Sequence, residues 1–340
     1  MDMPTATVIT IIIMAMRREA MPVTRPIFDS YLMVDWSAAN TPRRGRDSIW
    51  LCHLVRHGNT LLAAAPENLA TRQAAHERLR ELLCTDLAQQ RSVLVGCDFP
   101  FGYARGLAER LGLSRPAWRA VWDEIASRLQ DGPDNANNRF DVATQLNARI
   151  SGRAFPFWGC PTRKAAPCLA KTHHRRHEAE GLAERRLTDM RLRRLQPGWK
   201  LLGTGSAGSQ ALTGIPVVRR LRDDRLLAAR AQIWPFETGL RPLGRAETGG
   251  RIIFAEIYPS IVTVRPNSDE VKDSAQVRAI AGHFADLDRS GALGPVFAGD
   301  PALSAGDRAI VEDEEGWVLG IVGAEAAGRT RTNRVAVRTG

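Results

Sequence analysis

Four apolar segments of this chain run into an acidic residue, and this pattern constrains the fold more than any other feature. Residues 31–35 read Tyr-Leu-Met-Val-Asp, and residues 93–98 read Val-Leu-Val-Gly-Cys-Asp, while residues 252–256 and 231–237 end in glutamate. Short apolar runs of this kind are typical of buried strands. A carboxylate at the end of such a strand is costly unless it is hydrogen-bonded, paired or bound to a metal. The repetition predicts that these strand ends converge and hold a divalent cation. For one segment alone, a turn-capping Asp would explain the pattern equally well.

The segments between these strands predict an α/β fold. An antiparallel meander over residues 31–35, 48–55 and 60–65 is followed by a helix over 68–84 and then by the strand at 93–97. We expect a mixed sheet, with the antiparallel meander joined to parallel strands and with helices on its flanks. Further helices are predicted over residues 104–150, 175–195, from 272 onward and 307–315.

We predict one folded domain over residues 27–325, with a large helical and basic insertion at about 104–240. The whole chain has 340 residues, of which 44% are hydrophobic, and this suffices for one large domain or two small ones. Residues 1–26 are predicted to be a disordered extension or a wrongly assigned gene start, and 326–340 a basic tail. The apolar run at 8–16 is shorter than the roughly 20 residues that cross a bilayer, so no membrane partner is expected. Five scattered cysteines suit a reducing cytoplasm.

The charge of the chain points to a polyanionic partner. The formal net charge is +10, which favours nucleic acid, DNA or RNA, unless the chain is simply rich in arginine throughout. Residues 163–200 hold eleven Lys or Arg and four acidic residues. This segment is either a solvated helix face or a surface that contacts phosphates. On the second interpretation the contacting residues are Arg175, Arg176, Arg185, Arg186, Arg193 and Arg194.

The strand-end carboxylates suggest metal-assisted cleavage of phosphodiesters with Mg²⁺ or Mn²⁺ as the cofactor. Mg²⁺ favours a few carboxylates together with water and substrate phosphate, and two such cations can activate water and stabilise a leaving oxygen. We expect Asp35 to bridge, with Asp98 and Glu256 beside it. The further candidate ligands are Glu237 and one residue of 312–315, for which we select Glu315. Lys272 and Arg278 are candidates to neutralise the scissile phosphate.

A loop of small residues is a candidate phosphate site. Residues 203–208 read Gly-Thr-Gly-Ser-Ala-Gly and open a predicted helix, where backbone N–H groups can bind phosphate. Gly205, Ser206 and Gly208 are the candidates there, and Ser37 is expected to hydrogen-bond either a phosphate or Asp35. The spacing matches neither common nucleotide-binding motif, so a tight structural turn is the competing interpretation.

These residues resemble domain-of-unknown-function family 429, whose members are regarded as predicted nucleases of the ribonuclease-H-like fold. The resemblance is carried over residues 29–320 by four motifs: Val34-Asp35-Trp-Ser, Asp98-Phe-Pro-Phe-Gly, Ala255-Glu256-Ile-Tyr-Pro-Ser260, and Lys272 with Arg278. Arg139, Asp141 and Arg149 match an Arg–Asp–Arg stretch of the family in part. Where the family has an Asp in an alanine-rich C-terminal helix, this chain offers only residues 312–315. The resemblance implies a ribonuclease-H-like sheet and nuclease chemistry.

Three functions are compatible with these features. The first is a metal-dependent nuclease, and the second is a nucleic-acid-binding protein without catalysis. The third is an ATP-using phosphotransferase of the same fold, which predicts a duplicated fold with two glycine-rich phosphate loops, whereas the sequence offers one. Fold alone does not choose between them.

Overall fold

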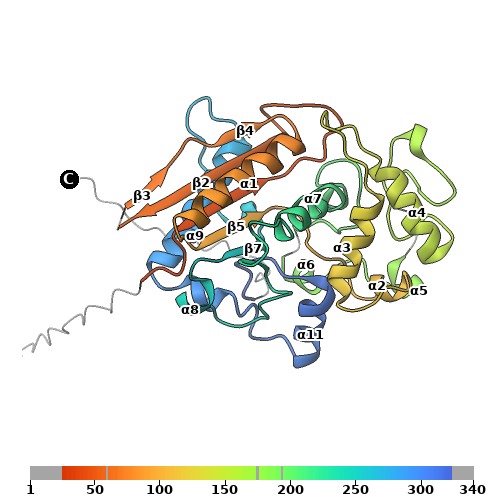
Figure 1. Cartoon of the computed structure of the whole chain (residues 1–340). Helices are drawn as coiled ribbons and strands as arrows, with labels where there is room; N and C mark the ends of the chain where they lie inside the picture. The colour runs from red at the N-terminus through yellow and green to blue at the C-terminus, as the bar shows by residue number, and fades with distance from the viewer. Residues whose placement is uncertain (1–24, 59, 174–175, 193, 324–340) are drawn as a thin grey trace, which may run out of the picture.

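A mixed sheet forms the centre of the protein (Figure 1). The structure, a computed structural model, describes residues 25–58, 60–173, 176–192 and 194–323. Within them the sheet has seven strands in the order β3-β2-β1-β5-β7-β6, and β4 also pairs with β2. The strands are β1 (Ser30–Asp35), β2 (Ile49–His57), β3 (Thr60–Ala63), β4 (Glu67–Leu69), β5 (Val93–Cys97), β6 (Ala231–Ile233) and β7 (Ile252–Glu256).

Strand directions follow the prediction of a meander joined to parallel strands. β2 is antiparallel to β1, β3 and β4, and a short turn joins β2 to β3. β1, β5, β7 and β6 run parallel to one another. Helices in the connections between these parallel strands cover one face of the sheet, and a helix that follows β7 covers the other. The mixed α/β sheet with flanking helices is therefore confirmed.

Helices lie in the segments between the strands and after β7. Those of eight residues or more are α1 (Arg72–Ala88), α3 (Ala117–Arg128), α4 (Arg139–Ser151), α7 (Ala207–Arg222) and α9 (Lys272–Arg289). The shorter ones are α2 (Leu107–Arg110), η1 (Thr162–Lys164), α5 (His177–Glu180), α6 (Leu187–Arg191), α8 (Arg245–Thr248), η2 (Pro259–Ile261), α10 (Leu293–Val296), α11 (Ala305–Ile310) and η3 (Val311–Glu315). None of the helices in the described part of the chain combines the length and apolar character that a bilayer crossing requires.

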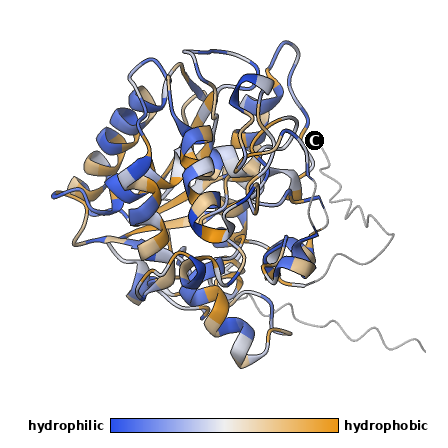
Figure 2. Ribbon diagram, turned by 90° about the vertical axis from the view of Figure 1, so that its right-hand side faces the viewer, coloured by the Kyte–Doolittle hydropathy of each residue, from blue (hydrophilic) through white to orange (hydrophobic). Residues whose placement is uncertain are grey.

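Two hydrophobic cores lie on the two faces of the sheet. Leu32 and Val34 of β1 share one core with α1 and α7, while Tyr31 and Met33 share the other with α9. This alternation follows from the two-residue period of a strand. Apolar residues accordingly concentrate inside the molecule and polar ones outside it (Figure 2).

The segment at 104–240 is not a separate unit. Its helices α2, α3, α4 and α7 contribute to the same core as the sheet. At Gly214 of α7, an added Cβ would lie 2.4 Å from the ring of Phe99, so glycine permits close approach of this helix to the loop after β5. The segment therefore completes one side of the main fold and also builds one wall of the cavity described below.

One predicted helix is wrong, and a second is present with a π-helical last turn. In the described part of 175–195, two short helices, α5 and α6, replace the continuous exposed helix, and Arg186, Thr188 and Asp189 are buried. Tertiary ion pairing of a buried arginine overrides the solvated-helix pattern there. The acidic helix predicted over 307–315 is confirmed: α11 continues directly into the π-helical turn η3, whose carboxylates accept from backbone N–H groups of other segments.

Candidate functional site

The carboxyl ends of three neighbouring parallel strands meet at one edge of the sheet. Val34 of β1 pairs in register with Cys97 of β5, and Cys97 pairs with Glu256 of β7. This register brings Asp35, Asp98 and Glu256 to the lining of one cavity of about 760 Å³. The position agrees with the rule that ligands of open α/β sheets bind beyond the carboxyl ends of the strands.

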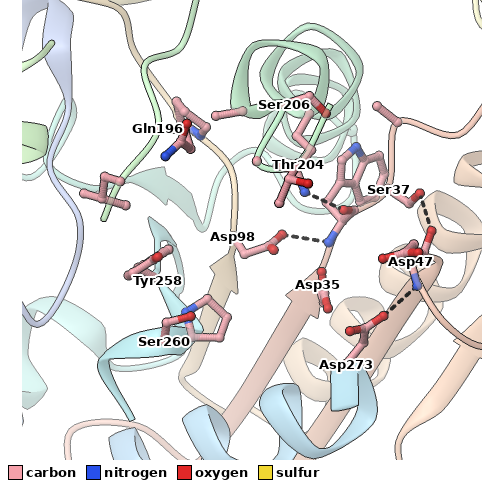
Figure 3. A pocket seen from close by; sticks show the side chains of 18 of the residues that line it. Asp35, Ser37, Asp47, Asp98, Gln196, Thr204, Ser206, Tyr258, Ser260 and Asp273 are labelled. Atoms are coloured by element: carbon pink, nitrogen blue, oxygen red, sulfur yellow. Dashed lines mark hydrogen bonds between the residues drawn. The ribbon is translucent and has the colours of Figure 1, made fainter. Parts of the chain in front are cut away.

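Asp35 and Asp98 form a directly interacting pair. Their carboxyl groups lie close enough for each to change the pKa of the other, and the Trp36 N–H donates to Asp98 Oδ1 at 2.7 Å (Figure 3). Burial, followed by the neighbouring Asp98 charge, raises the pKa of Asp35 well above its usual range. Burial also raises the pKa of Asp98 to about 6. Two neighbouring buried carboxylates cannot both ionise at low cost, and a bound cation would lower that cost.

Asp273, at the start of α9, adds a third negative charge that the sequence did not single out as a ligand. Its charge contributes to raising the pKa values of both Asp35 and Asp98. Its Oδ2 atom accepts the Asp47 N–H at 2.7 Å, which ties the loop after β1 to α9 (Figure 3). The available signal was an acidic residue in the first turn of a predicted helix, but the sequence analysis selected the neighbouring Lys272.

Glu256 reaches the same edge from the other face of the sheet. It stands in register with Val34 and Cys97, whose side chains belong to the core on the α1 and α7 side. Asp35 and Asp98 each follow one of these residues and therefore point to the α9 side. Glu256 is also already satisfied, because both of its oxygens accept from Arg186 and Oε2 accepts the Phe101 N–H at 3.0 Å.

The other predicted metal ligands lie apart from the Asp pair. Glu237 follows β6 by four residues and forms a bidentate ion pair with Arg222. Glu315 is 2% exposed and accepts the backbone N–H groups of Arg105 and Leu187. Neither residue lines the cavity. Each has a structural partner that accounts for its carboxylate.

The predicted phosphate-neutralising residues of α9 do not line the cavity either. Lys272 is exposed. Arg278 pairs with Glu270 through two nitrogens, at 3.1 and 2.6 Å. Along α9, the cavity is lined instead by Asp273 and Gln276.

The small-residue loop does line the cavity, but its glycines have structural roles. An added Cβ at Gly208 would lie 2.4 Å from the Gly198 carbonyl oxygen, and the Gly208 N–H donates to Lys200 O. Gly205 has a φ of +68°, which favours glycine. Ser37 lines the cavity and donates to the Asp47 carbonyl oxygen at 3.0 Å, not to Asp35. Thr204 and Ser206 border the cavity across from the acidic residues (Figure 3).

The arginines predicted to contact nucleic acid do not form one surface. Arg186 is buried, while Arg185 is half-buried and donates to the Leu195 carbonyl oxygen. Arg176 and Arg194 are exposed, and Arg194 lines the cavity. The other two, Arg175 and Arg193, lie outside the described residues.

In residues 25–323, apart from the undescribed positions among them, no three or more His, Cys, Asp or Glu side chains are arranged to hold a metal ion. The oxygen donors of Asp35 and Asp98 nevertheless suit a hard cation such as Mg²⁺, which completes its shell with water and substrate oxygens. Searches against family models, curated proteins and solved structures return no match to this chain. The functional argument therefore depends on the site itself.

Proposed function

We propose that this protein is a metal-dependent phosphodiesterase that cleaves nucleic acid, with a ribonuclease-H-like fold. The observation that carries the proposal is the Asp35–Asp98 pair, two neighbouring carboxyl groups that follow adjacent parallel strands and line one cavity. Strongly raised pKa values in a cleft are typical of functional sites. The resemblance to domain-of-unknown-function family 429 points in the same direction.

The strand order supports the fold assignment. A three-stranded antiparallel meander whose first strand continues into parallel strands is the arrangement that the ribonuclease-H-like resemblance implies. The phosphotransferase alternative predicts a duplicated fold, whereas the described residues contain one sheet. We therefore favour hydrolysis over phosphoryl transfer to a second substrate.

Asp35 and Asp98 would hold the cation, and Asp273 lies close enough to influence both. A bound Mg²⁺ or Mn²⁺ supplies charge neutralisation and an activated water at neutral pH. The Trp36 N–H fixes the orientation of Asp98, and the Asp47–Asp273 bond fixes the start of α9 relative to the loop after β1. Rigid positioning of this kind is required because misplaced groups lose much of their effect.

The test is incubation of purified protein with labelled single- and double-stranded DNA and RNA, with Mg²⁺, with Mn²⁺ and with a chelator. We expect metal-dependent cleavage that Asp35→Asn abolishes and that Glu237→Gln leaves intact, since Glu237 pairs with Arg222 outside the cavity. Salt-sensitive binding without cleavage, unchanged in Asp35→Asn, would instead identify a non-catalytic nucleic-acid-binding protein.

A further inference from the structure

Arg139, the first residue of α4, is a buried cation in the cavity that the proposed metal chemistry does not use. It is 7% exposed and lines the same cavity as Asp35 and Asp98. Burial, followed by the nearby Arg72 charge, lowers the pKa of Arg139 to about 10, so the residue remains charged at neutral pH. A buried charge is costly unless a partner compensates it.

The described partners of Arg139 are all neutral. Its guanidinium donates to Asn40 Oδ1, to Asn137 Oδ1 at 2.9 Å and to Ser209 Oγ at 2.9 Å. No described carboxylate forms an ion pair with it, and its Nη2 atom has no described acceptor. The contrast is Arg72, which forms a bidentate pair with Asp131. The side chain is therefore held by neutral groups, with the Phe140 ring centroid 4.4 Å from its Cζ atom, and the nearby Asp131 carboxylate pairs with Arg72 and not with it.

The loop before α7 offers unpaired donors at the same cavity. The backbone N–H groups of Thr204, Gly205 and Ser206 have no acceptor among the described residues. The first-turn N–H groups of α7 are not available, since residues 207–210 donate theirs to Gly205, Lys200 and Ser206. The free donors thus belong to the loop and not to the helix end.

Helix α7 connects Arg139 to the carboxylate side of the cavity. Ser209 Oγ accepts from Arg139, and the adjacent Gln210 donates through Nε2 to the Trp36 carbonyl oxygen at 2.8 Å. Trp36 in turn holds Asp98 through its N–H. One helical turn therefore connects the Arg139 cation with the acidic pair in one site.

We propose that Arg139 and the N–H groups of 204–206 form an anion subsite that binds a phosphate of the substrate next to the phosphate attacked at the carboxylates. The planar arginine fork matches phosphate oxygens. The substrate is then a strand with consecutive phosphates, not an isolated phosphomonoester. This identification of the substrate rests on the proposed function, whereas the anion subsite does not.

The first experiment measures the binding of inorganic phosphate and pyrophosphate to metal-free protein. Calorimetry and thermal shift are the two readouts. We expect Arg139→Gln to weaken pyrophosphate binding about tenfold or more, because a charge-assisted contact is lost. Arg149→Gln, in the same helix but paired with Glu124 and outside the cavity, is the control and should bind as the wild type does. Asp35→Asn should also retain binding, so loss of cleavage cannot be confused with loss of the subsite.

A tungstate soak of wild-type crystals keeps the proposal testable if Arg139→Gln fails to fold. Tungstate contacting Arg139 and residues 204–206 supports the subsite, whereas tungstate bound only elsewhere overturns it. Equal pyrophosphate affinity in wild type and in folded Arg139→Gln also overturns it. If the protein cleaves nucleic acid, Arg139→Gln should raise KM for an oligonucleotide more than it lowers kcat, since the lost contact is to a phosphate that does not react.

Discussion

Arg186 and Glu256 form a bidentate ion pair, with nitrogen–oxygen distances of 2.6 and 2.7 Å, and both side chains are 3% exposed. Asp189 also pairs with this guanidinium, which in addition donates to the Glu315 carbonyl oxygen. The network joins α6 to the end of β7 and to η3. It gives structural roles to one residue predicted to bind nucleic acid and to one predicted to bind metal.

Arg186→Met is expected to lower the free energy of unfolding by roughly 3–5 kcal/mol, because it leaves two buried carboxylates without their partner. Urea denaturation followed by circular dichroism measures this change. Arg185→Met, at the neighbouring half-buried position, should cost far less. Equal stability of the two variants would show that the buried network contributes little.

Glu256→Gln is expected to change Mg²⁺ affinity only slightly, because Glu256 is occupied by Arg186 and points to the other face of the sheet. Asp35→Asn should weaken Mg²⁺ binding at least about tenfold, since a carboxylate ligand is lost. Calorimetric titration of both variants compares them. A larger loss in Glu256→Gln would restore Glu256 as a ligand and would require its ion pair to open.

Asp273→Asn is expected to reduce metal-dependent activity by about tenfold or more, because its charge acts on both members of the Asp pair. Asp286→Asn is the matched control, since it lies in the same helix but is exposed and pairs with Arg289. The measurement compares the rates of metal-dependent cleavage of the two variants and the wild type at saturating Mg²⁺. If both variants retain full activity, Asp273 has no part in the site.

Asp98→Asn is expected to stabilise the metal-free protein at pH 7.5, on the order of 1 kcal/mol. The pKa of Asp98 is raised to about 6 from 3.8, so the folded state binds its proton more tightly than the unfolded state does. This contribution to stability is complete below about pH 4 and is lost as the pH rises through 6. Asparagine keeps the acceptor for the Trp36 N–H without the charge.

Unfolding of wild type and Asp98→Asn is therefore measured at pH 5 and at pH 7.5, in chelator. The difference in free energy of unfolding between the two proteins should grow with pH. Added Mg²⁺ should strongly stabilise only the wild type. A difference that does not change with pH would contradict the raised pKa.

Gly102→Ala is expected to destabilise the protein by about 1–3 kcal/mol through overpacking. An added Cβ would lie 2.2 Å from the Glu314 carbonyl oxygen and 2.5 Å from that of Glu315, and backbone cannot move aside as a flexible side chain can. Gly282→Ala in α9 meets nothing within 4 Å and should be neutral or stabilising, because alanine favours helix. Thermal unfolding compares the two, and a neutral Gly102→Ala would contradict this reasoning.

The sequence was sufficient to predict local elements whose pattern is set by short-range periodicity. The strands ending at Asp35, Cys97 and Glu256 form as predicted, as does the helix that begins at Lys272. It did not predict the break in the basic segment 175–195, because the burial of Arg186 depends on Glu256, which lies 70 residues away. Periodicity contains no information about a partner so distant.

The chain by itself determined that acidic residues follow buried strands and that these strands belong to a mixed α/β sheet. Tertiary structure decided which carboxylates can act together. Pleat direction places Asp35 and Asp98 on one face of the sheet and Glu256 on the other. Helix α9 brings Asp273 close to Asp35 and Asp98. Arg222 and Arg186 neutralise Glu237 and Glu256, respectively. The physical reason is that the free energy of a buried carboxylate depends on the charges and donors around it in space, and residues far apart in the chain supply them.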